Sequence, residues 1–202
     1  MTARIQRDFQ FVSGVYIENE FVMNVYNIDV QFTVESESIL EQNIALERIK
    51  YFFFECIENC VFIRDTDSEA IERFGNADLK LCLLPEDPYD QIVGIMLLVK
   101  LNSITEGRLQ VSDIRIESKM CDGVSYLHSM EENTGPFVLR GWWSDPSPKI
   151  TNKIPKSKGK KVVKLNKTPS TWDDLSLGWE PKKQETGTSE IVFASFQSKT
   201  DK

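Results

Sequence analysis

The chain has 202 residues, of which 41% are hydrophobic, so it is long and apolar enough to bury one sizeable core. Its formal net charge of −7 is unevenly divided: residues 1–143 hold 12 basic and 24 acidic side chains, whereas residues 144–202 hold 12 lysines and 7 acids. The acidic body should repel nucleic-acid phosphates. The basic tail could attract them, or could fold back on an acidic face of its own body or of a partner. The first residues lack the apolar core of a signal peptide, and no run reaches membrane-spanning length, so we expect a soluble, cytoplasmic protein with no membrane partner.

The N-terminal part of the sequence predicts a β-hairpin. Residues 9–17 are mostly apolar and indicate a first strand. Residues 21–35 alternate between apolar and polar side chains, which is typical of a half-buried antiparallel strand. The polar residues 18–20 supply the turn between them. Asn24 is the one polar residue on the apolar face of the second strand.

A long helix is predicted after the hairpin. Ser38 and Glu41 fit a capping box, in which the serine hydroxyl accepts from a free backbone amide and the glutamate reaches back. Apolar residues then recur at three- and four-residue steps, so the helix should run to about Val61 and pack one face on a sheet. A second, short helix follows Asp67, and residues 79–84 form a short strand.

The longest nearly unbroken apolar run, residues 92–101, is predicted to be the central strand of the sheet. A run that does not alternate is typical of a strand covered on both faces. The prolines just upstream, Gly94 within the run and the Asn-Ser pair after it argue against a buried helix. Residues 108–118 form the next strand, with a bulge near Ser112 that would place its four apolar residues on one face. Residues 124–127 form a last short strand.

Together these elements predict an α+β domain over residues 1–143, with a predominantly antiparallel sheet of about five to six strands and one long helix packed on one face. The order hairpin, helix, helix, hairpin resembles the tunnelling fold of pterin and purine enzymes. The resemblance implies a small-molecule-binding oligomer. Zinc-dependent members of that family use a histidine cluster, whereas this chain has the single histidine His128, so no zinc ligands are carried over.

Residues 144–202 are predicted to form a mostly disordered, lysine-rich tail, because prolines, lysines, serines and threonines replace the apolar periodicity. The lysine cluster could contact nucleic-acid phosphates without reading sequence, or could serve only as a solubilising linker. The candidate nucleic-acid contacts are Lys156, Lys158, Lys160, Lys161 and Lys164.

An aromatic island within this tail, residues 172–179, is predicted to bind a protein partner. Aromatic side chains in a disordered tail have no core of their own to fill, and they are the usual anchors of docking peptides. The candidate anchors are Trp172, Leu175, Leu177 and Trp179. The Leu-Ser-Leu sequence followed by Trp179 is similar to the peptides by which bacterial replication proteins bind the sliding clamp, although Asp174 replaces their leading glutamine.

A polar turn before the apolar run is the first candidate site. Its side chains could hold a divalent metal or orient a polar ligand. The alternative is a rigid turn whose aspartates satisfy backbone amides. The candidate residues are Glu86, Asp87, Tyr89, Asp90 and Gln91.

A second candidate site contains Glu117 and Lys119, which point to the same side of a strand because they are two residues apart. With an upstream acid, Asp90 or Asp113, they resemble the acid…Glu-x-Lys pattern of restriction-endonuclease-like nucleases. That resemblance implies metal-dependent phosphodiester hydrolysis, in which the carboxylates bind Mg²⁺ and the lysine assists the attacking water. The alternative is an exposed Glu–Lys pair on a strand.

The sequence contains no complete catalytic constellation, so our first hypothesis is a non-enzymatic binding or adaptor protein without a cofactor. Its acidic body would dock one partner, and its tail would reach a second protein or a nucleic acid. The metal-dependent hydrolase and the small-molecule-binding oligomer of tunnelling-fold type are the two alternatives.

Overall fold

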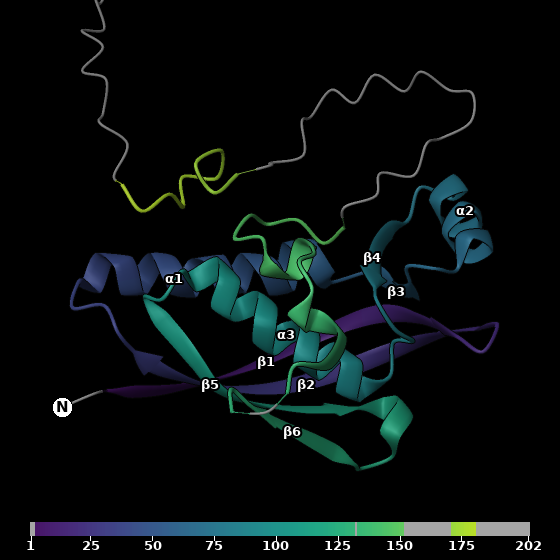
Figure 1. The fold of residues 1–202 in the computed structure, drawn as a ribbon, viewed down its shortest axis with the longest axis horizontal. Coiled ribbons are helices and arrows are strands. Elements are labelled where there is room, and N and C mark those ends of the chain that lie inside the picture. The colour runs from purple at the N-terminus through teal and green to yellow at the C-terminus, as the bar shows by residue number, and fades with distance from the viewer. Residues whose placement is uncertain (1–2, 132, 152–170, 181–202) are drawn as a thin grey trace, which may run out of the picture.

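The computed structural model describes residues 3–131, 133–151 and 171–180, and Figure 1 shows how their regular elements are arranged. The elements follow in the order β1 (Arg4–Ile17), β2 (Glu20–Val34), α1 (Ile39–Tyr51), β3 (Cys60–Arg64), α2 (Ser68–Asn76), β4 (Lys80–Leu84), α3 (Asp90–Thr105), β5 (Leu109–Ser118) and β6 (Ser125–Ser129). A π-helical turn, Phe52–Ile57, extends α1, and 3-10 turns are formed by Lys119–Cys121, Gly135–Val138 and Trp142–Ser144.

Six strands form one mixed sheet in the order β4-β3-β1-β2-β5-β6. The pairs β1–β2, β2–β5 and β5–β6 are antiparallel, whereas β3 runs parallel to both β1 and β4. The predicted α+β class and strand number are therefore confirmed. The sheet is mixed rather than wholly antiparallel, and three helices accompany it rather than one long helix.

Two specific predictions for the strands, the hairpin and the bulge, are confirmed. The turn between β1 and β2 consists of Glu18 and Asn19, whose left-handed φ angles are 52° and 66°. In β5 the register with β2 shifts at Ser112, which lies between the paired positions on either side. The shift places all the apolar residues of β5 in the core, namely Leu109, Val111, Ile114 and Ile116.

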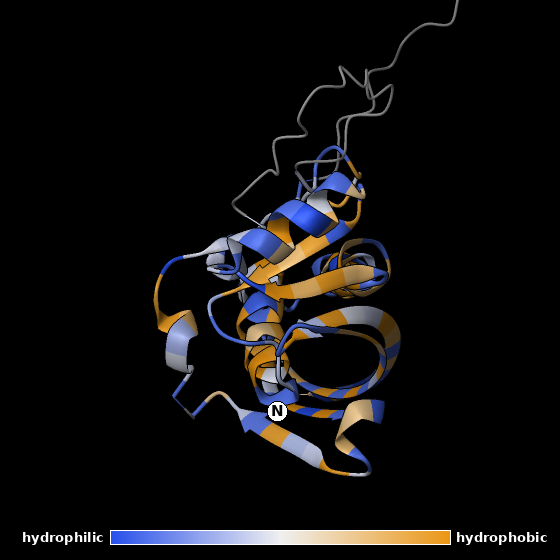
Figure 2. Cartoon of the chain, turned by 90° about the vertical axis from the view of Figure 1, so that its right-hand side faces the viewer, coloured by the Kyte–Doolittle hydropathy of each residue, from blue (hydrophilic) through white to orange (hydrophobic). Residues whose placement is uncertain are grey.

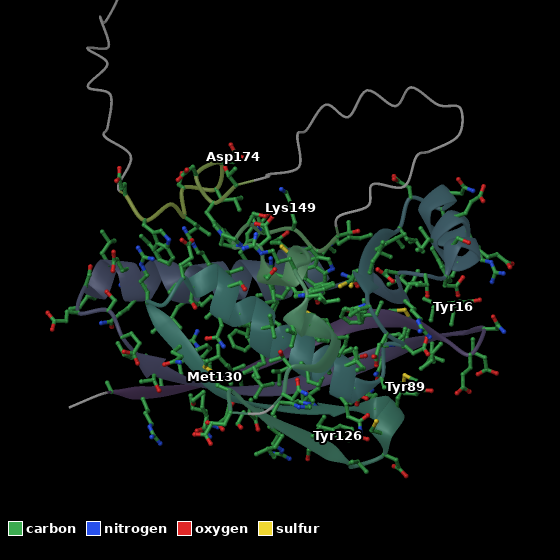
Figure 3. The ribbon with its side chains drawn as sticks, in the orientation of Figure 1. Tyr16, Tyr89, Tyr126, Met130, Lys149 and Asp174 are labelled. Carbon is green, nitrogen blue, oxygen red and sulfur yellow. The ribbon has the colours of Figure 1, made fainter. Side chains whose placement is uncertain are left out.

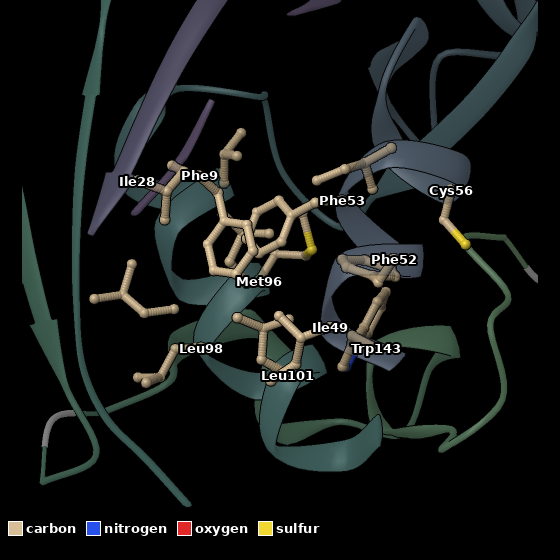
Figure 4. Close-up of a cluster of buried hydrophobic side chains, with 14 of the residues drawn as sticks. Phe9, Ile28, Ile49, Phe52, Phe53, Cys56, Met96, Leu98, Leu101 and Trp143 are labelled. Atoms are coloured by element: carbon tan, nitrogen blue, oxygen red, sulfur yellow. The ribbon is translucent and has the colours of Figure 1, made fainter. Parts of the chain in front are cut away.

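Helices lie on both faces of the sheet, and Figure 2 shows apolar and polar residues alternating along the strands between them. α1, its π-helical turn and α3 cover one face and enclose the main core (Figures 1 and 4). In this core Phe53 stacks on Phe9 with 4.2 Å between the ring centroids. α2 covers the opposite face of β1, β3 and β4, where Tyr16, Ile63 and Ala70 form a second, smaller cluster.

α1 begins as predicted and ends earlier than predicted. The Ser38 hydroxyl accepts a hydrogen bond from the Glu41 amide at 3.4 Å and so caps the helix. The second half of the predicted capping box is not formed, because the Glu41 carboxylate accepts from the Ser36 hydroxyl at 2.6 Å and the Ser38 amide donates to that same hydroxyl. The π-helical turn ends at Ile57, and Asn59 then takes a left-handed φ of 57° as the chain turns into β3. The predicted helix end near Val61 is wrong, because β3 has already begun there.

The prediction of a central strand at residues 92–101 is also wrong, because this stretch is the middle of α3. The helix packs on β5 and β6, on α1 and on the 3-10 turns that follow β6, so most of its sides are buried. A helix enclosed in this way has no polar face to mark its period. Its unbroken apolar sequence is then the same as that of a strand covered on both faces.

The features that argued against a helix have local explanations. The upstream prolines precede the first turn of α3, where a proline breaks no helical hydrogen bond. Gly94 allows the helix to approach the sheet, because a Cβ at this position would lie 2.6 Å from His128 Cδ2. Asn102 and Ser103 remain helical and donate side-chain hydrogen bonds to the carbonyls one turn earlier, both at 3.0 Å.

The segment that follows β6 closes the core from the helical side. Trp142 is fully buried, and its indole donates to the Leu83 carbonyl of β4 at 2.7 Å. Lys100 of α3 is also fully buried, and its ammonium donates to the carbonyls of Trp142, Asp145 and Ser147 at 2.9, 2.6 and 2.7 Å. A buried cation therefore holds this segment on α3.

Two stretches of the predicted tail fall within the described residues. Ile150 and Trp172 are buried and belong to the main core cluster, so these stretches pack on the body. Residues 152–170 and 181–202 lie outside the described part of the chain, and the predicted disorder stays a prediction there. Among the helices of the described residues, none has the length and apolar character needed to cross a membrane.

Candidate functional site

A group of polar side chains lies inside the core below the first turn of α3. We call Asn24, Tyr26, Asp90, Ser118 and Cys121 the polar cluster. Asn24 and Tyr26 are 0% exposed, Ser118 is 4% exposed and Asp90 is 5% exposed. Only Cys121 is partly accessible among these five. The cluster therefore lies deep in the fold, and its most accessible member, Cys121, lies in the 3-10 turn after β5.

Strand register brings these residues together. Tyr26 of β2 pairs with Ser118 at the end of β5, and Asn24 lies two positions before Tyr26 on the same face. The amides of Val25 and Met120 both donate to Asn24 Oδ1, at 3.0 and 3.3 Å, so its side chain ties β2 to the turn that carries Cys121. α3 then places Asp90, in its first turn, over this end of the sheet.

Several buried atoms of the polar cluster have no hydrogen-bond partner among the described residues. They are Asn24 Nδ2, Tyr26 Oη, Asp90 Oδ2 and Ser118 Oγ. A buried polar atom without a partner costs free energy, so such atoms normally bind ordered water or a ligand. The four atoms lie at one end of the core, where the Asn24 side chain also lies close enough to the Tyr26 hydroxyl to lower its pKa by hydrogen bonding, against the larger effect of burial.

Burial also raises the pKa of two members of the cluster, Tyr26 and Cys121. It raises the pKa of Tyr26 far above the usual range, and the negative charge of Asp90 raises that pKa further. Burial likewise raises the pKa of Cys121, and contact with Asp90 adds to the effect. Both groups are therefore protonated at neutral pH. The tyrosine can donate a hydrogen bond, and the thiol is not activated as a nucleophile.

The predicted polar turn is only partly directed into the protein. Asp87 pairs with Arg64 at 3.3 Å, and the Tyr89 hydroxyl donates to Glu18 at 3.2 Å, so both side chains tie surface loops together. Glu86 and Gln91 are exposed. Asp90 is the one predicted ligand of this turn that lies in the polar cluster. Partial burial raises the pKa of Tyr126, labelled in Figure 3, and the nearby Cys121 and Asp90 of the cluster raise it further.

The predicted nuclease residues do not converge. Asp113 and Glu117 lie on the outer face of β5, opposite the exposed Gln31 and Asn27 of β2, whereas Asp90 lies on the core face. Arg115 bonds to Glu117 at 3.2 Å. Lys119 is exposed in the turn after the strand. Within the described residues no three acidic, histidine or cysteine side chains are grouped as metal ligands. The geometry therefore favours the exposed-pair alternative, and the Mg²⁺ site stays without support.

The predicted partner-binding residues lie on the chain's own body. Trp172 is 6% exposed, and Leu175, Leu177 and Trp179 are partly buried against the main core. Asp174, labelled in Figure 3, marks this segment above α1, on the side of the molecule opposite Tyr126. These side chains therefore pack on the body of the same chain, whereas the adaptor hypothesis requires them to be exposed for a partner.

The predicted nucleic-acid contacts cannot be placed in the fold. Lys156, Lys158, Lys160, Lys161 and Lys164 lie outside the described residues. Their contact with phosphates stays a prediction from charge alone.

Four members of the polar cluster were not predicted as site residues. The available signal was Asn24, a polar residue on the apolar face of an alternating strand. Tyr26 and Ser118 carry no such mark, because a tyrosine fits an apolar face and a serine fits a strand end. Their pairing depends on the β2–β5 register, which is a property of the folded sheet.

No known family model matches the chain, and no curated protein resembles it significantly in sequence. Solved structures do share its fold. An uncharacterized protein from Wolinella succinogenes, WS1659, matches with a TM-score of 0.50 at 12% identity, over 64% of this chain and 99% of that one. At this identity the match shows a common fold and nothing about activity.

Two enzymes give lower scores. The 6-pyruvoyltetrahydropterin synthase of Plasmodium vivax matches with a TM-score of 0.41 at 8% identity, over 63% of this chain and 97% of that one. The Plasmodium falciparum enzyme matches with a TM-score of 0.38 at 11% identity, over 63% and 96%. Scores this low carry no argument about the site or the substrate.

Proposed function

We propose that this protein binds a small polar molecule in the polar cluster, as a member of the tunnelling-fold type. The observation that carries the proposal is the group of buried polar atoms without partners at one end of the core. The order of elements supports the fold type. The hairpins β1–β2 and β5–β6 are adjacent in the sheet, α1 and α3 lie between them in sequence, and β3, α2 and β4 form an insertion.

The chemistry of the cluster defines the class of ligand. Asn24 Nδ2 and the Tyr26 hydroxyl offer donors, whereas Asp90 Oδ2 offers an acceptor with negative charge. A complementary ligand presents a carbonyl oxygen or ring nitrogen to the donors and an N–H group to the carboxylate. Small heterocyclic amides and amidines, neutral or cationic, carry both groups side by side, and an anion would be repelled by Asp90.

An oligomer is the second part of the proposal. β6 is an edge strand of the sheet, and it pairs with the end of β5 that carries Ser118 of the cluster. Apolar side chains are exposed along this edge, namely Met120 at 43%, Val124 at 50%, Leu127 at 67% and Met130 at 44%. An unpaired apolar edge is a surface for strand pairing, and a second copy there would cover the edge.

Binding is tested by calorimetric titration with a panel of heterocyclic amides and amidines. Tyr26→Phe and Asp90→Asn each remove one recognition group, so each should raise Kd about tenfold or more. Tyr16→Phe, in the cluster under α2, and Asp87→Asn, in the same turn as Asp90, are matched controls and should leave Kd unchanged. If no compound binds, and native mass spectrometry of protein from its own host finds no bound molecule, the cluster holds only water.

The oligomer is tested separately by measuring mass in solution. Light scattering should give a multiple of the 23.2 kDa chain mass. Leu127→Lys should reduce this mass, because it places a charge on the edge, and Leu139→Lys, at an equally exposed position away from β6, should not. A wild-type monomer would refute the oligomer and leave the binding result unaffected.

A further inference from the structure

The side chain of Arg48 on α1 is buried beneath residues 171–180, far from the polar cluster. It is 2% exposed, although a charged side chain is rarely buried without several partners. Its Nη1 donates to Glu106 at 2.7 Å and to the Ile104 carbonyl at 3.0 Å, both at the end of α3. Its Nε donates to the Leu177 carbonyl at 2.8 Å, across to the C-terminal segment.

Two indole rings complete the surroundings of this guanidinium. The Arg48 Cζ lies 3.6 Å from the ring centroid of Trp179 and 5.1 Å from that of Trp172. Arg108 lies over Trp179 as well, at 4.3 Å, so two cations contact one indole. The Trp179 Nε1 donates to Glu106 at 2.9 Å, and the same carboxylate oxygen accepts from Arg48. The Nε and Nη1 of Arg48, the Trp179 indole N–H and the Glu106 carboxylate are therefore all engaged in this contact.

The second indole is seated in the same way. The Trp172 Nε1 donates to the Pro146 carbonyl, and its ring meets Tyr51 of α1 edge-on, with 5.9 Å between centroids. The amides of Leu175 and Leu177 both donate to the Trp172 carbonyl, at 3.2 and 2.8 Å, so the segment forms a compact turn between its tryptophans. A cavity of about 660 Å³ remains between this turn and the body, lined by Arg48, Glu106 and Arg108 among others.

We propose that this surface is a peptide-binding groove, which we call the Arg48 groove, and that it accepts residues 171–180 of a second copy in place of its own. The groove recognises two indoles seven positions apart and one carbonyl between them. It does so with a buried guanidinium, a carboxylate and a backbone carbonyl. The same peptide from another copy offers identical groups, so exchange between copies loses no contact.

The tether determines which copy supplies the peptide. Residues 152–170 join the peptide to the body, and a tethered ligand competes at an effective concentration on the order of millimolar. A free chain therefore fills its own groove. Exchange becomes measurable when the peptide of one copy or the groove of the other is disabled.

A complementation experiment with full-length chains tests the groove. One copy carries Arg48→Met, which removes the guanidinium and keeps the peptide. The other carries Trp172→Ala with Trp179→Ala, which removes the indoles and keeps the groove. The mixture should associate at least tenfold more tightly than either variant with itself, measured by energy transfer between labelled chains. Arg140→Met, an exposed arginine elsewhere, replaces Arg48→Met as the matched control and should give no stronger association than wild type, because its own groove keeps its own peptide.

A synthetic peptide of residues 171–180 provides the second measurement and needs only one variant. It should bind the double tryptophan variant at least tenfold more tightly than wild type, whose groove is filled, and adding Arg48→Met should abolish this binding. If the double variant does not fold, the peptide is titrated into the single variant Trp179→Ala. A folded variant that binds neither the peptide nor the complementary chain overturns the proposal. This result is independent of ligand binding in the polar cluster on the other side of the molecule.

Discussion

At the scale of single residues, several positions carry a residue type that is unusual for their surroundings. Asn24, Asp90 and Lys100 are polar residues in a core, and Gly94 is a glycine in the middle of a helix. Each departure corresponds to a contact across the fold. Asn24 and Asp90 belong to the polar cluster, and Lys100 binds the segment after β6. Gly94 leaves room for the side chains of the sheet that pack against α3.

Gly94→Ala should lower the free energy of unfolding by about 1–3 kcal/mol. An added Cβ would lie 2.6 Å from His128 Cδ2 and 2.9 Å from Ile116 Cγ2, and both of these side chains are buried. This crowding outweighs the gain in helix propensity, which is about 1 kcal/mol for alanine over glycine. Denaturant unfolding measures the change, with Gln91→Ala, exposed in the same helix, as the control. A variant as stable as wild type would contradict the close approach.

At the scale of elements, α1 and its π-helical turn show how a fourfold aromatic sequence is divided. Phe52 and Phe53 are fully buried, whereas Phe54 is 46% exposed, although the three residues are adjacent. A helical backbone turns each residue to a different side from the one before it, so neighbours in sequence can face the core and the solvent. The sequence Tyr-Phe-Phe-Phe cannot by itself say which phenylalanine faces inward.

Phe53→Ala should therefore lower the free energy of unfolding by about 3–5 kcal/mol, because it opens a cavity beside Phe9. Phe54→Ala, the neighbouring residue with the same chemistry, should lower it by less than about 1 kcal/mol, because half of its ring is already in water. Thermal and denaturant unfolding of the two variants give the comparison. Equal losses would show that the helix is turned differently from the arrangement in Figure 4.

At the scale of the whole molecule, residues from far along the chain close the core. The Lys100 ammonium binds three carbonyls of the segment after β6, and Arg48 binds a carbonyl of residues 171–180. Lys100 lies on α3 and Arg48 lies on α1. These helices have the sheet on one side and the C-terminal segments on the other. The helical layer is therefore complete only when residues 142–147 and 171–180 have packed onto it.

Lys100→Met should lower the free energy of unfolding by about 3 kcal/mol at neutral pH, because one buried and two partly buried carbonyls lose their donor. Lys119→Met, at an exposed position, should change it by less than about 0.5 kcal/mol. Denaturant unfolding with both variants distinguishes the buried cation from a general effect of charge.

The same residue predicts a dependence on pH. Burial lowers the pKa of Lys100 to about 8, below the 10.5 of a free lysine. Between these values the folded chain has released a proton that the unfolded chain keeps, so this group makes the free energy of unfolding rise with pH. The stability of wild type relative to Lys100→Met should therefore increase from about pH 8 to about pH 10. A constant difference would show that the ammonium keeps its proton in the fold.

The sequence by itself determined the features that depend on neighbouring residues. The β1–β2 hairpin, the cap of α1, the start of α2 and the bulge in β5 follow from alternation, capping side chains and turn residues, and all lie where they were predicted. Each is stabilised by contacts within a few residues or across one strand pair, so local chemistry is enough to specify it.

The tertiary structure alone decided the features that depend on what covers a segment. Residues 92–101 form a helix that the sheet, α1 and the segment after β6 enclose. An unbroken apolar run has the same pattern in a buried helix and in a buried strand, so the sequence does not distinguish them. The polar cluster depends on the register of β2 and β5 beneath α3, and the site of residues 171–180 depends on Arg48. These partners lie far apart in sequence, so only the folded chain brings them together.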